Sequence, residues 1–150
     1  MCIVNYCGRK LRMVSHNSFN NHIDSIGQLA EIEAQHFLEH HGLILREQNF
    51  ITYDINGKKC GEIDLIMRDK SELVFVEVKA RSDEKYGHVL EMIPKPKQNR
   101  IIRTATKYLV QHNLYNTAAC RFDVIGINWN QKNQKPDEIF WIKNAFEVEY

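Results

Sequence analysis

The sequence predicts a single α/β domain in which a mixed sheet of about five strands lies between helices. Apolar residues recur at helical spacing in two segments and with strand-like patterning in five, in the order helix, three strands, helix, two strands. Each helix has an apolar stripe that needs a sheet face to cover it. The chain has 150 residues, of which 43% are hydrophobic, and this suits one globular domain with one core.

The first predicted helix follows a polar segment without periodicity. Residues 1–22 are expected to form a flexible tail, with Met13 as an alternative start of the chain, and residues 23–150 to form the domain. The helix begins at Asp24 or Ser25 and runs to His41, where Gly42 ends it.

Three strands are predicted next. Residues 43–53 are extended and lead to a turn at Asn56-Gly57. Residues 61–67 and 72–80 are joined by a short polar link, so they form a β-hairpin.

The second helix begins near Pro94 and Pro96, because proline is favoured in a first helical turn. Its predicted apolar stripe contains Ile101, Ile102, Ala105, Tyr108 and Leu109. Two further strands follow at 121–129 and 138–146. An apolar run of about 18 residues is lacking, so no membrane span is expected. The four cysteines match no zinc or C-x-x-C spacing and indicate reduced thiols in a cytoplasmic protein.

Charge is unevenly distributed along the chain, although the net charge is only +1. Residues 62–78 contain five acidic and two basic side chains, whereas residues 79–107 contain eight basic and three acidic ones. An acidic block beside a basic block fits a cation site next to an anionic ligand. A solvated surface with accidental clustering explains the charges equally well.

The strand at 72–80 carries the first candidate site residues. Alternation places Val74, Val76 and Val78 on one face and Glu77 and Lys79 on the other, at the end of a strand that is covered on both sides. Burying such groups is costly unless they are paired or bind a metal. An internal ion pair between Glu77 and Lys79 is the simpler alternative.

Asp64 is the second candidate, on the partner strand of the hairpin. In an antiparallel hairpin, the numbers of any two facing residues add up to the same sum. If that sum is 141, Asp64 lies directly opposite Glu77, and if it is 139, Asp64 lies diagonally from Glu77. Two carboxylates this close repel each other unless a divalent cation neutralises them. Hard oxygen ligands favour Mg²⁺ or Mn²⁺. Alternatively, Asp64 is a polar residue on the wet face of an amphipathic strand.

Glu31 is the third candidate, on the first helix. At 100° per residue it falls at the border of the stripe that contains Ala34 and Leu38, so it can reach toward the sheet. An ordinary glutamate at a helix edge remains the alternative.

These residues together resemble the PD-(D/E)xK nuclease superfamily, in its Holliday-junction-resolvase-like branch. More closely, the chain resembles the YraN-like family of uncharacterised, endonuclease-like bacterial proteins. The resemblance covers about Gly27 to Phe146. It is carried by G-x3-E-x2-A (27–34), GEIDLIMRD (61–69), LVFVEVKARSDEKYG (73–87), K-x2-R-I-I (97–102), RFDVIGI (121–127) and NAF (144–146). It implies a three-layer α/β/α restriction-endonuclease-like fold.

The resemblance also implies roles for single residues. Asp64 and Glu77 would bind the metal, with the backbone carbonyl of Val78 as a further ligand. Glu31 would bind directly, through water, or at a second metal. Lys79 would orient the attacking water or stabilise developing charge. Gln28 and Leu29 replace residues that are often acidic in the family, but they are not among these ligands.

A set of basic residues is the candidate nucleic-acid surface. Helical spacings of three and four place several of them on one face of the second helix, where they would hold phosphates without reading sequence. The set comprises Arg81, Lys95, Lys97, Arg100, Arg103 and Lys107. An ordinary solvated helix face is the alternative.

Three functions fit these residues. The first is a Mg²⁺-dependent endonuclease that hydrolyses phosphodiester bonds, on branched or structured DNA. The second is a non-catalytic nucleic-acid-binding module of nuclease ancestry. The third is a structural salt-bridge network. Analogy with resolvases suggests a homodimer, on the fold alone.

Overall fold

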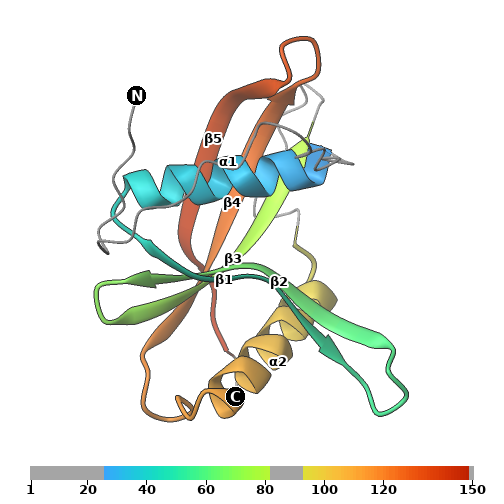
Figure 1. Ribbon diagram of the computed structural model, residues 1–150, viewed down its shortest axis with the longest axis vertical. Coiled ribbons are helices and arrows are strands. Elements are labelled where there is room, and N and C mark those ends of the chain that lie inside the picture. The colour runs from blue at the N-terminus through green and yellow to red at the C-terminus, as the bar shows by residue number, and fades with distance from the viewer. Residues whose placement is uncertain (1–25, 82–92, 149–150) are drawn as a thin grey trace, which may run out of the picture.

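The computed structural model describes residues 26–81 and 93–148, and its elements follow the predicted order (Figure 1). They are α1 (Ile26–His40), β1 (Ile44–Tyr53), β2 (Lys59–Asp69), β3 (Glu72–Arg81), α2 (Lys95–Gln111), β4 (Cys120–Asn130) and β5 (Lys135–Phe146). The predicted tail at 1–22 lies outside the described residues.

The largest difference from the predicted boundaries is at β5, which begins at Lys135 and not at residue 138. Pro136 stands inside this strand. Because β5 is an edge strand, the missing N–H of proline need not serve a neighbouring strand there.

The five strands form one mixed sheet in the order β1-β2-β3-β4-β5. Only β3 and β4 are parallel, and the other neighbouring pairs are antiparallel. A parallel pair needs a long crossover connection, and α2 lies in it.

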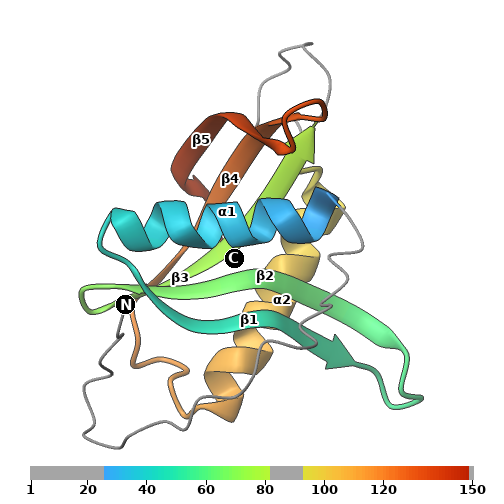
Figure 2. The same ribbon diagram turned by 45° about the horizontal axis from the view of Figure 1, so that its top comes forward.

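Each face of the sheet is covered by one helix, which makes three layers (Figure 2). On one face α1 buries Ala30, Ala34 and Leu38 against the even-numbered valines of β3. On the other face α2 buries its apolar stripe against the odd-numbered residues Leu73 and Phe75. The prediction that the strand at 72–80 is covered on both sides is therefore confirmed. Across residues 26–81 and 93–148, neither helix is long and apolar enough to cross a membrane.

The hairpin of β2 and β3 opens into a fork at Asp64. Leu65 pairs with Val76, so opposed residue numbers sum to 141, as one of the two predicted registers requires. This ladder ends at Leu65, and the earlier residues of β2 pair with β1. Opposite the fork, Asn49 of β1 has a φ of 51°, which lets that strand turn sharply. The paired strands β1 and β2 consequently swing away from β3 (Figure 1).

Beyond the fork, β2 comes into direct contact with α2 at Gly61. A Cβ atom added to Gly61 would overlap Thr104 Oγ1 of α2 and would lie 3.0 Å from Thr52 Oγ1 of β1. Thr104 is buried, and its hydroxyl donates a hydrogen bond to the Arg100 carbonyl at 2.8 Å. Only glycine therefore permits this approach of helix and strand.

Gly61→Ala is expected to lower the free energy of unfolding by about 1–3 kcal/mol, because the added methyl group must push α2 away from β2. Urea unfolding followed by circular dichroism would measure the change. Adding Thr104→Ala should restore part of the loss, since Thr104 Oγ1 is the overlapping atom. Adding Thr106→Ala is the matched control, because that hydroxyl also donates to its own helix but is not among the contacts of Gly61. Equal rescue by both threonine changes would contradict this account.

Candidate functional site

Glu77 is the most deeply buried acid of the candidate site, with a side chain only 2% exposed. Its Oε1 atom accepts ion pairs from Lys79 Nζ at 2.8 Å and from Lys97 Nζ at 3.1 Å. Its Oε2 atom is buried and finds no hydrogen-bond partner within residues 26–81 and 93–148. The predicted internal ion pair therefore exists, but it leaves one carboxylate oxygen unsatisfied, which is costly in a protein interior.

Asp64 occupies the fork next to Glu77. Its Oδ2 atom accepts a hydrogen bond from the Val78 backbone N–H at 2.7 Å. The side chain thus takes the place of a backbone acceptor where β2 has left β3. Burial, followed by repulsion from the Glu77 carboxylate, raises the pKa of Asp64 to about 7, while the Val78 hydrogen bond and Lys97 oppose the shift. The positive charge and hydrogen bonding around Asp64 therefore do not fully compensate its carboxylate.

Glu31 approaches the same region from α1. Its side chain is half-buried, as its place at the border of the apolar stripe predicted. Burial raises the pKa of its carboxyl, and the neighbouring Glu62 and Glu77 carboxylates add to the shift. A side-chain hydrogen bond with Asn49, the residue with positive φ opposite the fork, acts in the other direction.

The three predicted acids are thus electrostatically coupled, although they come from both sides of the sheet. Repulsion from Glu77 and from Glu31 contributes to the raised pKa of Asp64. Within the described part of the chain, however, no three His, Cys, Asp or Glu side chains are close enough together to enclose a metal ion. A cation here would rely on the two strand carboxylates, supplemented by main-chain oxygen, water or substrate, which is common for Mg²⁺.

Lys97 has a place that sequence reasoning did not assign to it. The spacing of basic residues made it a candidate phosphate contact near the start of the second helix, yet its ammonium group pairs with the buried Glu77. The pairing arises because α2 lies directly on β2, with Gly61 as the point of contact. The sequence did contain a signal for this position. Lys97 lies four residues before Ile101, which is buried in the core, so both residues lie on the helix face that packs against the sheet.

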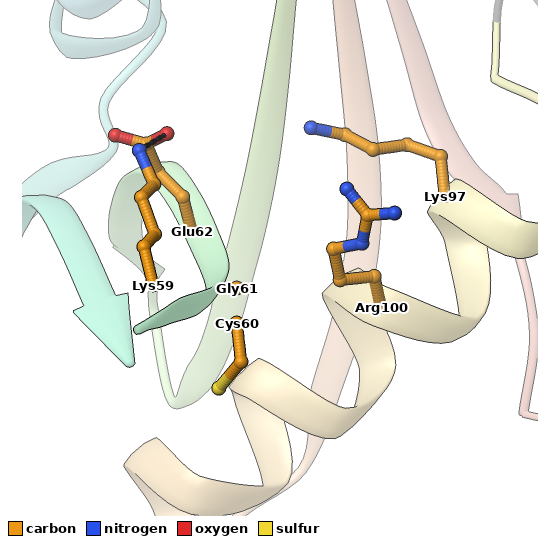
Figure 3. Close-up of a pocket in the computed structure, with 6 residues that line it drawn as sticks. All are labelled: Lys59, Cys60, Gly61, Glu62, Lys97 and Arg100. Atoms are coloured by element: carbon orange, nitrogen blue, oxygen red, sulfur yellow. Dashed lines mark hydrogen bonds and ion pairs between the residues drawn. The ribbon is translucent and has the colours of Figure 1, made fainter. Parts of the chain in front are cut away.

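A pocket of about 420 Å³ lies between the start of β2 and the N-terminal half of α2 (Figure 3). One wall is formed by residues 59–62, and the other by Lys97 and Arg100, which extend from the helix toward the strand. Lys59 forms an ion pair with Glu62 within the wall from β2. Because Lys97 also contacts Glu77, the pocket lies next to the buried carboxylates.

The other predicted phosphate-binding residues are at the surface. Exposed side chains are found at Arg81, Lys95, Arg100, Arg103 and Lys107. The Lys107 ammonium group donates to Cys60 Sγ at 3.4 Å, which places this part of α2 against the start of β2. Exposure fits either phosphate binding or a solvated face, so their binding role stays a prediction.

A separate charged cluster lies at the other end of β3. Arg121 contacts Glu72 at 2.6 Å, Asp69 at 2.9 Å and the fully buried Asp123 at 3.0 Å. Asp69 and Glu72 flank the β2–β3 turn, so the cluster ties that turn to β4. Arg121 and Asp123 therefore form a structural ion pair.

Fold and site together define this chain as an α/β protein with a restriction-endonuclease-like fold. The sequence profile of the uncharacterised protein family UPF0102 matches residues 30–127, and the chain belongs to that family, which confirms the resemblance to YraN-like proteins. A UPF0102 protein of Coxiella burnetii is 43% identical over 125 residues, which cover 83% of this chain and 94% of the relative. Relatives from Nitrosococcus oceani and Legionella pneumophila are 38% identical over 123 residues and 39% identical over 122 residues. These alignments cover 82% and 81% of this chain, and 92% and 94% of the relatives.

The raised pKa of Asp64 predicts that the metal-free protein loses stability as pH rises from about 4 to about 7. In this range the folded state keeps a proton that the unfolded state has already released, so ionisation favours unfolding. A shift from 3.8 to about 7 sets an upper limit of about 4 kcal/mol on the effect. Chemical denaturation at a series of pH values in the presence of EDTA would measure it.

Asp64→Asn keeps an acceptor for the Val78 N–H but cannot ionise, so it should flatten this pH dependence and stabilise the protein at pH 8. Glu138→Gln, on the exposed surface of β5, is the control and should leave the dependence unchanged. An identical pH profile for Asp64→Asn and the wild type would contradict the assignment.

Proposed function

We propose that this protein is a metal-dependent nuclease that hydrolyses phosphodiester bonds in nucleic acid, and that its substrate is branched or structured DNA. The observation that carries the proposal is the pair of acids at the fork. Glu77 has a buried oxygen without a partner among residues 26–81 and 93–148, and Asp64 beside it has a pKa of about 7. Two adjacent carboxyl groups whose negative charge is only partly compensated by nearby lysines fit a site for a divalent cation.

Mg²⁺ or Mn²⁺ suits these donors, because both ions prefer hard oxygen ligands. Asp64 and Glu77 would hold the cation, with the Val78 carbonyl as the further ligand that the family resemblance implies. Glu31 would contribute through water or at a second cation. When bound, the cation would polarise a non-bridging phosphate oxygen and lower the pKa of a coordinated water.

Two lysines supply positive charge beside the acids. Lys79 is 35% exposed, so its ammonium group can leave Glu77 and meet a phosphate or an attacking water. Lys97 lines the pocket and is 30% exposed, so it can do the same from the side of α2. Positive charge here would stabilise the negative charge that gathers on phosphate in the transition state.

The exposed bases of α2 would hold the nucleic-acid backbone. Arg100 lines the pocket, and Arg103 and Lys107 continue in the same direction along the helix at spacings of three and four residues. Contacts of this kind supply affinity without reading sequence. Arg81, at the exposed end of β3, would add a contact beyond Lys79. A non-catalytic binding module would use the same surface, and the ion pairs of Glu77 with two lysines favour that alternative by partly neutralising the acid without a metal.

Mn²⁺ binding is expected for the wild type and is expected to be lost in Asp64→Asn. Isothermal titration calorimetry in a chelator-free buffer would measure binding, and the thermal midpoint should rise with Mn²⁺ only in the wild type. Glu138→Gln, remote from the fork on β5, should bind as the wild type does. Equal heats of binding for the wild type and Asp64→Asn would overturn the metal site and leave a structural charge network.

Cleavage is expected when the protein is incubated with branched, single-stranded or duplex DNA and Mn²⁺. Glu77→Gln, Asp64→Asn and Lys79→Ala should each reduce the rate at least about a hundredfold, because each removes a ligand or a charge acting in the transition state. Denaturing gel electrophoresis of end-labelled DNA would measure the rates.

Glu138→Gln, prepared in the same way, should cut as fast as the wild type. If the three site variants also cut at the wild-type rate, a contaminating nuclease is responsible and the catalytic proposal fails. If the wild type binds DNA and Mn²⁺ but cuts none of the three substrates, the binding-module alternative is correct.

A further inference from the structure

The tip of the β1–β2 hairpin presents large apolar side chains to solvent. Ile55 is 100% exposed and Tyr53 is 57% exposed. The hairpin projects from the body of the molecule, because β1 and β2 leave the rest of the sheet at the fork (Figures 1 and 2). An isoleucine at such a point contributes nothing to the core, and full exposure of its side chain in water is unfavourable.

The loop that carries Ile55 is held by its own hydrogen bonds. Asp54 Oδ1 accepts from the backbone N–H groups of Asn56 and Lys58, at 2.8 and 2.9 Å. The Asp54 N–H in turn donates to the Lys58 carbonyl at 2.9 Å, and Gly57 takes a φ of +77°, which glycine adopts without strain. Ile55 is therefore presented on a preformed turn, so an ordering cost on binding is largely avoided.

Basic residues of α2 lie near the base of this hairpin, while within the hairpin itself Asp54 and Glu62 balance Lys58 and Lys59. Lys58 and Lys59 follow Ile55 along the hairpin, and residues 59–62 form one wall of the pocket whose other wall carries Lys97 and Arg100. Lys107 of α2 contacts Cys60 beside the same strand. A polyanion held along α2 would consequently pass the base of the hairpin and meet its apolar tip.

We propose that the β1–β2 hairpin is a wedge that inserts Ile55 between bases at an open step of a nucleic acid whose phosphates are held by α2. The inference rests on the proposed function and names the feature of the substrate that would be selected. A rigid apolar side chain gains burial by entering an unstacked step, and the energy needed to open that step is smallest where stacking is already interrupted. Branch points and nicks are therefore preferred over intact duplex.

Charge complementarity favours nucleic acid as the occupant. The apolar tip is small, since Tyr53 and Ile55 are the large apolar side chains among the exposed residues 53–59. Protein partners usually cover a much larger and less charged surface. Basic residues of α2 near a single wedge residue instead match a phosphate backbone with one accessible base step.

The test uses a four-way DNA junction with 2-aminopurine at the branch point, in EDTA so that nothing is cut. Wild-type protein should raise the fluorescence, because insertion unstacks the labelled base. Ile55→Ser should abolish the rise and weaken junction binding about tenfold, while changing binding to an intact duplex of equal length less than twofold. Ile44→Ser is the matched control, since Ile44 is a 50% exposed isoleucine at the other end of β1.

Junction binding and fluorescence that are the same for Ile55→Ser and the wild type would overturn the wedge, as would an equal loss in Ile44→Ser. Failure to bind any of these DNAs would also overturn it, as would Ile55-dependent binding to anionic phospholipid vesicles in place of DNA. The outcome is independent of catalysis. If the fluorescence rise depends on Ile55 but no DNA is cut in Mn²⁺, the wedge is supported and the nuclease is rejected. If DNA is cut in Mn²⁺ but the fluorescence rise does not depend on Ile55, the nuclease is supported and the wedge is rejected.

Discussion

The structure of the site depends on one constraint, which is the burial of the Glu77 carboxylate in the middle of a sheet. A buried acid must be compensated, and here the compensation is incomplete, because two lysines share one oxygen while the other oxygen has no partner in the described residues. Asp64 increases the deficit by adding a second carboxylate at the fork. Such incomplete compensation of buried charge is costly to stability, and sequences that break the rules of core packing usually do so at functional sites.

The fork explains how a small sheet accommodates these groups. In an unbroken ladder, Asp64 would lie across from Glu77 with backbone hydrogen bonds on either side. With β2 turned away, the Asp64 side chain instead accepts the Val78 N–H, and space opens between the strands. The same divergence brings Gly61 against α2 and carries the hairpin tip outward. One local change of strand direction therefore positions the acids, the pocket and the exposed isoleucine.

Much of the fold could be predicted because it depends on local periodicity. The parity of the β2–β3 register follows from the number of residues in the turn, and the observed sum of 141 is one of the two predicted registers, although the ladder ends at Leu65 before Asp64 can pair with Glu77. Apolar residues on both faces of β3, Val74 and Val76 on one and Leu73 and Phe75 on the other, likewise indicated a strand that is covered on both sides. The pairing of Lys97 with Glu77 could not be predicted, because it depends on how closely a helix approaches a strand 36 residues earlier, through the contact of Gly61 and Thr104. The turn at Asn49 was missed for a similar reason, since an asparagine within a strand does not by itself indicate a positive φ.

The position of Lys97 determines how much of the chain would have to move together if this site were transferred to another protein. Its ammonium group reaches Glu77 from the helix that crosses between the parallel strands, whereas Glu31 comes from the helix on the opposite face. This charged site is therefore not a module that could be moved to another scaffold with a single hairpin. A graft that preserved its charge balance would have to carry both helices and the three strands between them, which is most of the described chain.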